Sequence, residues 1–360
     1  MKVLQLGGAF HQSFFIDELT LNNYYVECLD NIPINPGHNY AKISHNISIT
    51  DIENIKKVIQ NKKFIVSSYG SDIAELSRNL IIGDKGKHIN LLKKLSARRL
   101  LKKVFIDQKQ PNIKIANLDE NYQENYCVIK PNISSGSKGI SLISSAEKIK
   151  NAIKIAQERS IDGVAVIEEF IENDGNKYYC EGLLINNIIY LVMGCSKSSS
   201  GTIEWDGSIQ ITEENVSCFT NLSYEYLEKL LTDSILKMSD AVSKSSFAFN
   251  IDFFINNGKI IIIEFTTRPG GNLLPLVLEH KYRINHSLSY LSILEGRPQL
   301  IYRDRPVWNI DPKKIIQISI IKYIFSEEIE MLKADNIIIL KRKYSDQVKS
   351  EKLAALIYGN

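Results

Sequence analysis

The chain has 360 residues, more than one ordinary globular core accommodates, so its length favours two or three packed units. Hydrophobic residues make up 44% of it and charged residues 24%, which is typical of a folded protein and excludes long disordered tracts. The 44 basic and 41 acidic side chains leave a net charge of only +3, far from the strongly positive surface that nucleic-acid binding requires.

Five widely spaced cysteines form no CxxC pair, and their odd number indicates reduced thiols rather than a disulfide framework. The first residues, MKVLQLGGAF, lack the long apolar segment of a signal peptide. No apolar run approaches the ~18 residues of a membrane span. We therefore expect a cytoplasmic protein with neither a nucleic-acid nor a membrane partner.

Residues 1 to about 86 alternate expected strands and helices, which predicts a parallel sheet of the Rossmann type. The strands are KVLQL, YYVECLD and FIVSSYG, with one helix running to Leu21 and another beginning near Ser71. Glycines after the first strand and Asp30 after the second suggest a dinucleotide site. Because GGAFHQ lacks the G-x-G start and the third glycine, a simple tight turn is the favoured interpretation.

A basic helical segment follows, KGKHINLLKKLSARRLLKK, with leucines on one face and lysines on a mostly solvated one. One of these lysines is a candidate contact for phosphate. Next, the strand YCVIK ends at Pro131, and the loop NISSGSKGI joins it to the strand SLIS. Such a loop can present backbone N–H groups to an anion, and it is equally compatible with a plain hairpin connection. A helix around 146–156 and the strands VAVIEEFI, CEGLLI and IIYLVMG complete an α+β lobe.

The segment AFNIDFFINNGKIIIIEFTTRPGG predicts two antiparallel strands joined near Asn257 and Gly258. A two-residue turn there would place Asp252 and Glu264 on opposite faces. A three-residue loop, with Ile255 paired to Lys259, would place both carboxylates on one face. We predict the three-residue loop.

In that register Thr266 and Arg268 share the face of the two carboxylates, and the other face is apolar. The apolar face would carry Ile251, Phe253, Ile261, Ile263 and Phe265. Two carboxylates on one face repel each other unless a cation lies between them, and Mg2+ with oxygen ligands is the natural choice. A surface acid in a salt bridge with Arg268 is the alternative. The following PGGN leads into a helix near 273–282, whose N-terminus favours an anion.

The ordered set VIKP, SSGSKGI, IEEFI, NIDFF and IEFTTRPGG resembles the ATP-grasp superfamily over nearly the whole chain. The resemblance is to its carboxylate-amine ligases, the carbamoyl-phosphate-synthase-like branch. It implies an α/β and α+β architecture: a Rossmann-like domain (1–86), a two-lobed ATP-grasp domain (87–300) with a small lobe at about 126–190, and a C-terminal subdomain (301–360). We can name no chemistry for the last of these.

The resemblance also implies roles for residues in this sequence. Lys94 and Lys130 would contact the nucleotide phosphates. The loop over the triphosphate would comprise Ser134, Ser135, Gly136, Ser137, Lys138 and Gly139. The hinge that holds adenine would comprise Glu168, Glu169, Phe170 and Ile171.

Asp252 and Glu264 match the metal ligands of the resembling family, for Mg2+ or alternatively Mn2+, and Thr266 stands at the position of a third ligand. Arg268, with Lys130, would act on the transferred phosphoryl group, and the substrate would lie at Gly270, Gly271 and Asn272. The chain departs from the family at two of these places. Thr266 replaces the usual asparagine, so the number of metal ions stays open. Lys177 stands near the expected ribose-binding glutamate, with Glu181 further on.

This resemblance implies an ADP-forming ligase. A small-molecule carboxylate would attack the γ-phosphate of ATP, and an amine or ammonia would then displace phosphate from the acyl phosphate. Charged side chains would act by electrostatic stabilisation. The same scaffold supports ATP-dependent carboxylases and kinases, and a nucleotide-binding regulator without turnover is a further alternative. Homodimers are common in the family, so a second copy of the chain is a candidate partner.

Overall fold

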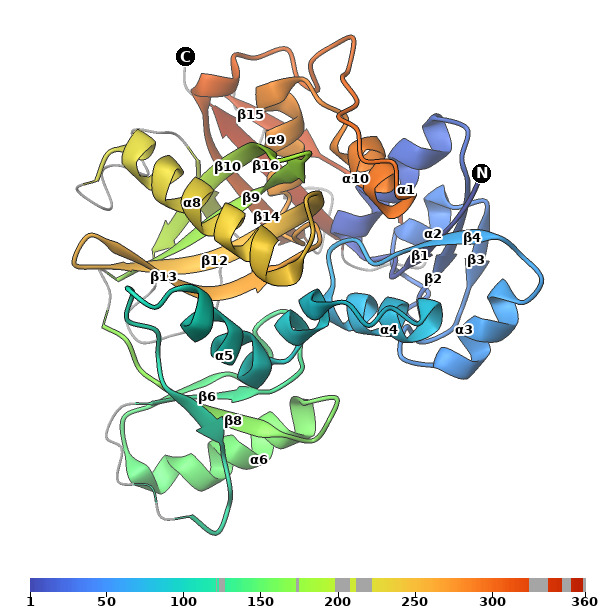
Figure 1. Ribbon diagram of the computed structural model, residues 1–360. Helices are drawn as coiled ribbons and strands as arrows, with labels where there is room; N and C mark the ends of the chain where they lie inside the picture. The colour runs from blue at the N-terminus through green and yellow to red at the C-terminus, as the bar shows by residue number, and fades with distance from the viewer. Residues whose placement is uncertain are drawn as a thin grey trace.

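The computed structural model describes residues 1–120, 122, 127–172, 175–197, 208–211, 222–323, 336–344 and 351–358. Their strands form three sheets, and the helices lie against these sheets (Figure 1). Within these ranges no helix is long and apolar enough to cross a membrane. Cys218 lies outside the described residues.

The N-terminal sheet is parallel, as predicted, with the strand order β3-β2-β1-β4. Alternate residues of β1 enter two different cores: Val3 packs with α1, whereas Leu4 packs toward α3 and α4. Helices therefore cover both faces of the sheet. Its elements are β1 (Lys2–Leu6), α1 (Phe10–Leu21), β2 (Tyr25–Leu29), α2 (Gly37–Tyr40), β3 (Ile43–His45), α3 (Ile52–Ile59), β4 (Phe64–Ser67) and α4 (Asp72–Ile82).

Asp30 holds the glycine turn after β1. Its carboxylate accepts hydrogen bonds from the Gly8 amide (2.7 Å), the Ile32 amide (2.8 Å) and the Asn35 side chain (2.8 Å). These bonds occupy both oxygens of a buried acid. The tight-turn interpretation therefore accounts for Asp30, and the structure gives no support to a dinucleotide site.

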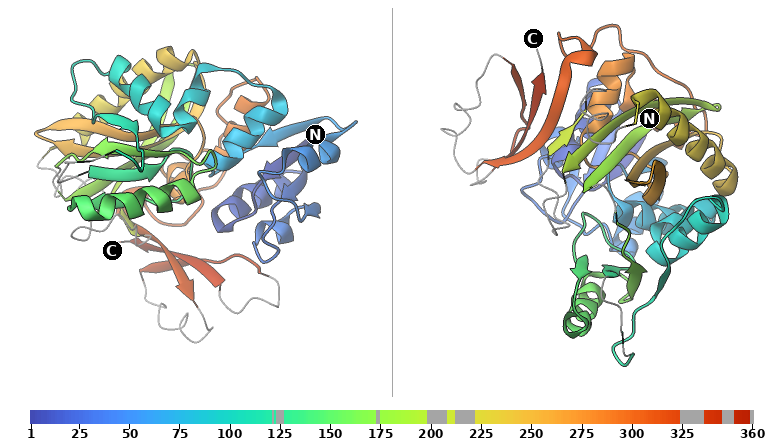
Figure 2. Two further views of the ribbon diagram at one scale, coloured as in Figure 1. Left: turned by 90° about the horizontal axis from the view of Figure 1, so that it is seen from below. Right: turned by 90° about the vertical axis from the view of Figure 1, so that its left-hand side faces the viewer.

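The small lobe is an antiparallel sheet of order β5-β8-β6-β7 with one helix packed against it (Figure 2). The chain enters the small lobe through the 3-10 helix η1 and the helix α5, which starts at Lys94. The elements are η1 (Lys87–Leu92), α5 (Lys94–Val104), β5 (Ile113–Ile115), β6 (Cys127–Pro131), β7 (Ser141–Ile143), η2 (Ala146–Lys148), α6 (Ile149–Arg159) and β8 (Ala165–Glu169).

The central sheet has the order β13-β12-β9-β10-β11-β14-β16-β15. The strands CEGLLI and IIYLVMG belong to this sheet and not, as we expected, to the small lobe. They are long enough to pair along ten residues with each other, and β9 also pairs with β12. The elements are β9 (Asn176–Ile185), β10 (Ile188–Lys197), β11 (Ser208–Gln210), α8 (Tyr224–Val242), β12 (Phe247–Asn256), β13 (Lys259–Thr266), α9 (Leu274–Tyr282) and α10 (His286–Leu294).

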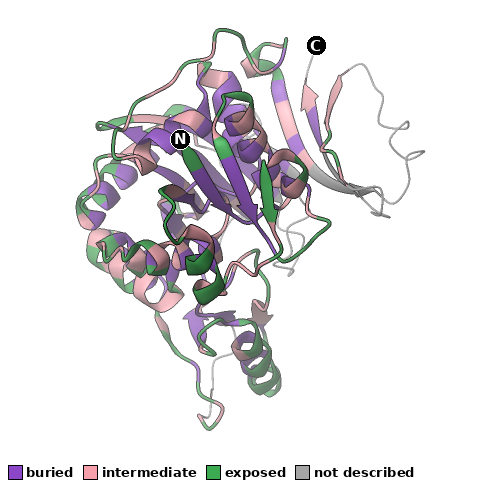
Figure 3. Ribbon diagram, turned by 90° about the vertical axis from the view of Figure 1, so that its right-hand side faces the viewer, coloured by how far each residue is buried: buried purple, intermediate pink, exposed green. Residues whose placement is uncertain are grey.

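The C-terminal strands extend the central sheet through β11 and project from its edge (Figure 2). They are β14 (Ile315–Tyr323), β15 (Ile337–Leu340) and β16 (Glu351–Tyr358), preceded by η3 (Pro312–Lys314). The two faces of the central sheet enter different cores. One packs on α5 and α8, and the other packs on α9, α10 and the N-terminal helix α1. The strands between these two cores, such as β9, are accordingly mostly buried, whereas β15 at the edge of the sheet is half-buried (Figure 3).

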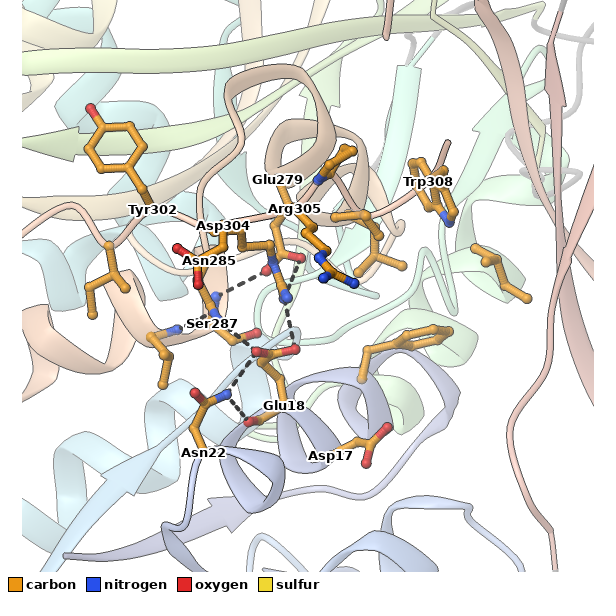
Figure 4. A pocket seen from close by; sticks show the side chains of 18 of the residues that line it. Asp17, Glu18, Asn22, Glu279, Asn285, Ser287, Tyr302, Asp304, Arg305 and Trp308 are labelled. Atoms are coloured by element: carbon orange, nitrogen blue, oxygen red, sulfur yellow. Dashed lines mark hydrogen bonds and ion pairs between the residues drawn. The ribbon is translucent and has the colours of Figure 1, made fainter. Parts of the chain in front are cut away.

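A cavity of about 670 Å³ lies between α1, the end of α9 and the segment 301–308 (Figure 4). Arg303 crosses it, 2.7 Å from Glu18 and 3.0 Å from Glu279, and Asn285 donates to Glu18 at 2.6 Å. This network joins the N-terminal domain to α9 and to the segment after α10. No residue that we predicted for catalysis lines the cavity.

Glu279 provides a test of this network by pH. Burial raises the pKa of Glu279 from 4.5 to about 7, although Arg303 opposes the shift. Between pH 4.5 and 7 the folded chain therefore holds a proton that the unfolded chain releases, so stability falls as pH rises. We expect Glu279→Gln to remove this pH dependence. The difference in the free energy of unfolding between the variant and the wild type should therefore change by roughly 3 kcal/mol between pH 4.5 and 7. Urea unfolding at each pH measures this.

The exposed Glu147→Gln substitution is the matched control, and it should leave the slope unchanged. Parallel stability curves for wild type and Glu279→Gln would contradict a buried, proton-holding Glu279.

Candidate active site

The β12–β13 hairpin turns in two residues, so our prediction of a three-residue loop is wrong. Asn256 pairs with Lys259, and Asn257 and Gly258 both have positive φ, 49° and 72°. This is the type I′ geometry that an Asn-Gly pair favours. Such a turn alone would separate the two carboxylates onto opposite faces.

A β-bulge restores the alignment further along the hairpin. Phe253 pairs with Ile262, but Asp252 pairs with Glu264, so Ile263 is the extra residue. The two carboxylates are consequently direct neighbours on one face, as we predicted, although by a different route. The apolar face changes with the register: Ile260 and Ile262 join its core, in place of the predicted Ile261 and Ile263.

Arg98 satisfies the backbone of the bulge. Its guanidinium donates to the carbonyl oxygens of Ile262 (2.5 Å) and Ile263 (3.1 Å). Successive carbonyls of a regular strand point to opposite sides, so the bulge brings both within reach of one side chain. The same guanidinium donates to Gln110 (2.9 Å) and to Glu168 of the small lobe (3.3 Å). Arg98 therefore links helix α5, the hairpin and the small lobe.

Strand β9 completes a group of polar residues that we call the polar face. Asp252 pairs with both Tyr179 and Glu264, and Asn250 pairs with both Glu181 and Thr266. Directly paired residues point to the same side of a sheet, and so do alternate residues of one strand, so all six side chains lie on one face. Strand alternation adds Lys177, whose Nζ lies 2.6 Å from Asp252. The polar face comprises Lys177, Tyr179, Glu181, Asn250, Asp252, Glu264 and Thr266.

Arg268 is held at the edge of the polar face by the N-terminal domain. Its guanidinium donates twice to one oxygen of Asp72, at 3.0 and 2.5 Å, and both side chains are buried. Asp72 is the first residue of α4, where a carboxylate is also favoured by the helix dipole. Burial raises the pKa of Asp72 to about 6 against the opposing effect of Arg268. Sequence reasoning found Asp72 only as a helix start.

The two predicted lysines act on different carboxylates, Lys130 on Glu168 and Lys94 on Glu264. Lys130 is 2.7 Å from the Glu168 carboxylate, and burial lowers the pKa of Lys130. Burial would raise the pKa of Glu168, but Lys130 and Arg98 together hold it below its usual value. Lys94 opens helix α5, and its amide donates to the carbonyl of Asn132 (2.9 Å). Burial likewise would raise the pKa of Glu264, and the charge of Lys94, followed by Arg268, lowers it.

The glycine-serine loop joins β6 to β7. Gly136, Ser137 and Gly139 have φ values of 70°, 57° and 79°, which bend the backbone sharply. A Cβ at Gly139 would lie 2.8 Å from Arg159, whereas Gly136 has open space around it. Ser134 is buried at the start of the loop, Ser135 is half-buried, and Gly136 to Lys138 are exposed.

The predicted hinge, residues 168–171, covers the last two residues of β8 and the two residues that follow. Glu169 ends β8 and accepts from the backbone and side-chain nitrogens of Asn112, at 3.1 and 2.9 Å. Its other oxygen lies 3.0 Å from Lys109. Ile171 is buried, and Phe170 lies between them in the chain. Both glutamates are thus engaged with protein groups.

The buried carboxylate of Glu181 holds the segment after Arg268 in place. The Gly270 amide donates to both oxygens of Glu181, at 3.1 and 3.0 Å, and a Cβ at this glycine would lie 2.5 Å from that carboxylate. Burial raises the pKa of Glu181 well above its usual value. Asn272 accepts from the amide of Leu274, the first residue of α9, at 3.2 Å. Two of the N–H groups that we assigned to a substrate anion are thus engaged within the protein.

Gly271 faces the N-terminal domain. A Cβ there would lie 3.2 Å from the Gly70 carbonyl and 3.3 Å from His11. The neighbouring Pro269 carbonyl accepts from the Gly70 amide at 3.2 Å. The loop after Arg268 therefore lies against the loop that follows β4.

Oxygen donors for a divalent cation are present where the hairpin strands face each other. Asp252 and Glu264 are opposite each other, which fits one ion with hard oxygen ligands. Thr266 fits less well, because its hydroxyl is buried and lies 3.3 Å from the carbonyls of both Asn250 and Arg268. Across the described residues no cluster of three or more acidic, histidine or cysteine side chains forms a ready-made metal cage.

Comparison with known proteins gives a match over part of the chain. Residues 103–280 match the family described as D-ala D-ala ligase C-terminus. A formate-dependent phosphoribosylglycinamide formyltransferase from Methanocaldococcus jannaschii is 30% identical over 149 residues, which cover 40% of this chain and 34% of that protein. The same-named protein of Bordetella pertussis is 29% identical over 195 residues, covering 48% and 47%. The chain thus spans a third to a half of the length of these relatives.

Solved structures match the whole chain. An L-amino acid ligase from Bacillus licheniformis has a TM-score of 0.70 at 13% identity, covering 100% of this chain and 93% of that one. An N5-carboxyaminoimidazole synthetase from Staphylococcus aureus, complexed with ADP, has a TM-score of 0.71 at 13% identity with the same coverage. Residues 103–280 thus resemble the D-ala D-ala ligase C-terminal family, and the fold of the whole chain is that of these solved structures.

The role of Arg98 leads to a stability prediction. Arg98→Met leaves Glu168 with one fewer cation and the bulge carbonyls without a donor, so we expect the free energy of unfolding to fall by roughly 3–5 kcal/mol. The control is Arg99→Met, one residue along the same helix and exposed. Denaturant midpoints measure both, and equal midpoints for the two variants would contradict the linking role of Arg98.

Proposed function

We propose that this protein is an ATP- and magnesium-dependent ligase that joins a small-molecule carboxylate to an amine or ammonia through an acyl phosphate, releasing ADP. The observation that carries the proposal is the polar face. Two opposed carboxylates and Arg268 lie on one edge of the central sheet, within range of the charge of Lys94. This combination suits a phosphoryl group in transit, whose transfer depends on positioning and charge neutralisation.

The nucleotide would lie between the small lobe and the polar face. Lys130 and Lys94 would contact its phosphates, with the loop Ser134–Gly139 beside them. Because the side chains of Glu168 and Glu169 are engaged, the base would be recognised by backbone groups of the hinge. Asp252 and Glu264 would hold Mg2+, which supplies neutralisation of phosphate charge when bound.

The carboxylate and amine would bind where the N-terminal sheet reverses its strand order. That point lies between β1 and β4, and ligands of parallel sheets bind beyond the carboxyl ends of such strands. The loop after β4 contacts the Pro269–Gly271 segment next to Arg268. A carboxylate at this junction would lie near the Arg268 guanidinium, which would stabilise the phosphoryl group as it passes to that carboxylate. The relatives named for formate-dependent formyl transfer and for amino acid ligation support an acid as one substrate.

ADP release with panels of acids and amines tests the proposal, with hydroxylamine as a trap. An acyl phosphate reacts with hydroxylamine to give a hydroxamate, so we expect acid-dependent hydroxamate and ADP in equal amounts. Dependence on bicarbonate instead would indicate a carboxylase. No ADP release under any condition would contradict an enzyme and favour a nucleotide-binding regulator.

Glu264→Gln should lower the turnover number at least ~100-fold, because it removes the charge of a carboxylate proposed to hold the Mg2+ that neutralises the phosphate groups. Its control is the exposed Glu158→Gln, which should retain full activity. Glu264 is the sharper target than Arg268, whose removal also leaves the buried Asp72 without its cation. Normal turnover in a folded Glu264→Gln enzyme would contradict the assignment.

A further inference from the structure

The cavity between α1 and the segment 301–308 takes no part in the proposed chemistry. Its volume of about 670 Å³ is within the range of sites that bind small organic molecules. No residue that we assign to the nucleotide, the metal ion or the substrates lines it. Its wall combines helix α1, the chain from α9 to Trp308, and Arg342 just after β15 (Figure 4). A ligand in this cavity would therefore occupy a second site.

Two acids of the wall are already supplied with hydrogen-bond donors by the protein. Glu18 accepts through Oε1 from the side chains of Asn22 (2.9 Å) and Asn285 (2.6 Å), and its Oε2 lies 2.7 Å from Arg303. Glu279 accepts through Oε1 from the first two backbone amides of α10, and through Oε2 from Arg303 at 3.0 Å. Every oxygen of these two carboxylates is thus engaged.

The guanidinium groups of the same wall keep most of their donors unused. Each carries several N–H donors and no acceptor. Arg303 uses only its Nη2 atom, and Arg342 uses only Nη1, which donates to Asp17 at 2.6 Å. In the part of the chain that the structure describes, nothing accepts from the Nε of either side chain, and Arg305 forms neither a hydrogen bond nor an ion pair. A ligand rich in acceptors would satisfy these donors.

Fixed apolar surface lies in the same wall as the guanidinium groups. Trp308 is only 8% exposed, and Leu276 and Leu288 line the cavity with it. The guanidinium of Arg342 lies 3.7 Å from the centroid of the Phe14 ring, a cation–π contact that restricts its movement. Because these groups are held in place before a ligand arrives, little conformational entropy is lost on binding. The cavity therefore suits a ligand with an anionic group and an apolar body.

The charge of the wall limits how many negative groups the ligand carries. Four carboxylates and three guanidinium groups line the cavity. The carboxylates are Asp17, Glu18, Glu279 and Asp304, and the guanidinium groups are Arg303, Arg305 and Arg342. Burial raises the pKa of Glu279 to about 7, so this acid is partly uncharged at neutral pH, and Asp304 is exposed to the screening solvent. The formal charges nearly cancel, which suits one anionic group and not a triphosphate.

We propose that this cavity binds a small organic anion, which has one carboxylate or phosphate group among the guanidinium groups and an apolar body against Trp308. Charge-assisted hydrogen bonds from the arginines hold the anionic group. The ligand joins α1 of the N-terminal domain to the segment 301–308, at a site separate from that of the proposed ligase reaction.

Tryptophan fluorescence tests this inference, because Trp308 lines the cavity and the sequence has only one other tryptophan, Trp205. In Trp205→Phe, the emission of Trp308 is recorded during titration with phenylacetate, phenyl phosphate and the neutral phenylacetamide. We expect a saturable change with at least one of the two anions, with a dissociation constant below ~1 mM, and at least ~10-fold weaker binding of the amide. The anion that binds more tightly identifies the group as carboxylate or phosphate.

Arg305→Met is the discriminating variant, because this exposed side chain has no hydrogen bond or ion pair in the described structure to lose on substitution. It should weaken binding of the anion at least ~10-fold. The control is Arg297→Met, at an exposed position outside the cavity, which should leave the affinity unchanged. Isothermal titration calorimetry of the unsubstituted chain measures the same constants if Trp205→Phe does not fold.

Several outcomes would overturn the inference. They are no saturable binding of either anion, equal affinity for phenylacetamide, and an unchanged affinity in Arg305→Met. We also expect the anion to bind in the presence of saturating adenylyl imidodiphosphate, a non-hydrolysable ATP analogue. Competition between the two would place the probe in the nucleotide site and overturn the inference as well. All these results leave the proposed ligase reaction to its own test.

Discussion

The interaction on which the site depends is the one between Arg98 and the bulge at Ile263. A two-residue Asn-Gly turn would by itself put Asp252 and Glu264 on opposite faces of the hairpin. One extra residue in β13 reverses this, and its displaced carbonyls accept hydrogen bonds from a buried guanidinium. Because that guanidinium also binds Glu168, the alignment of the carboxylates and the attachment of the small lobe depend on the same side chain.

The remaining parts of the site are held from other directions by buried acids. Asp72 reaches from the N-terminal domain to orient Arg268, and Glu181 fixes the Gly270 amide beside it. Each acid lies far from its partner in the chain. The N-terminal domain thus does more than cover the central sheet: it supplies the anion that positions the guanidinium proposed to act on the phosphoryl group.

Local patterns in the sequence were sufficient to predict most helices and strands and many of the residues that form the site. Alternating strand and helix segments predicted the parallel N-terminal sheet, and strand alternation with an assumed three-residue loop predicted the shared face of Asp252 and Glu264. The turn was wrong because period-two alternation cannot reveal a bulge, which shifts register without a signature residue. Asp72 and the carbonyl contacts of Arg98 could not be predicted, because they are tertiary contacts made by residues that also suit an ordinary helix. Lys177 was visible only as a departure from the resembling family, and its partner needed the pairing of β9 with β12.

The central claim is that ATP binds between the small lobe and the polar face of the central sheet. Photolabelling with 2-azido-ATP, followed by mapping of the labelled peptide, tests it most directly. The account predicts ATP-protected label in the segment that contains Glu168 to Ile171. Protected label in the N-terminal domain, near Gly8 and Asp30, would contradict it and restore a nucleotide site in the Rossmann-like sheet.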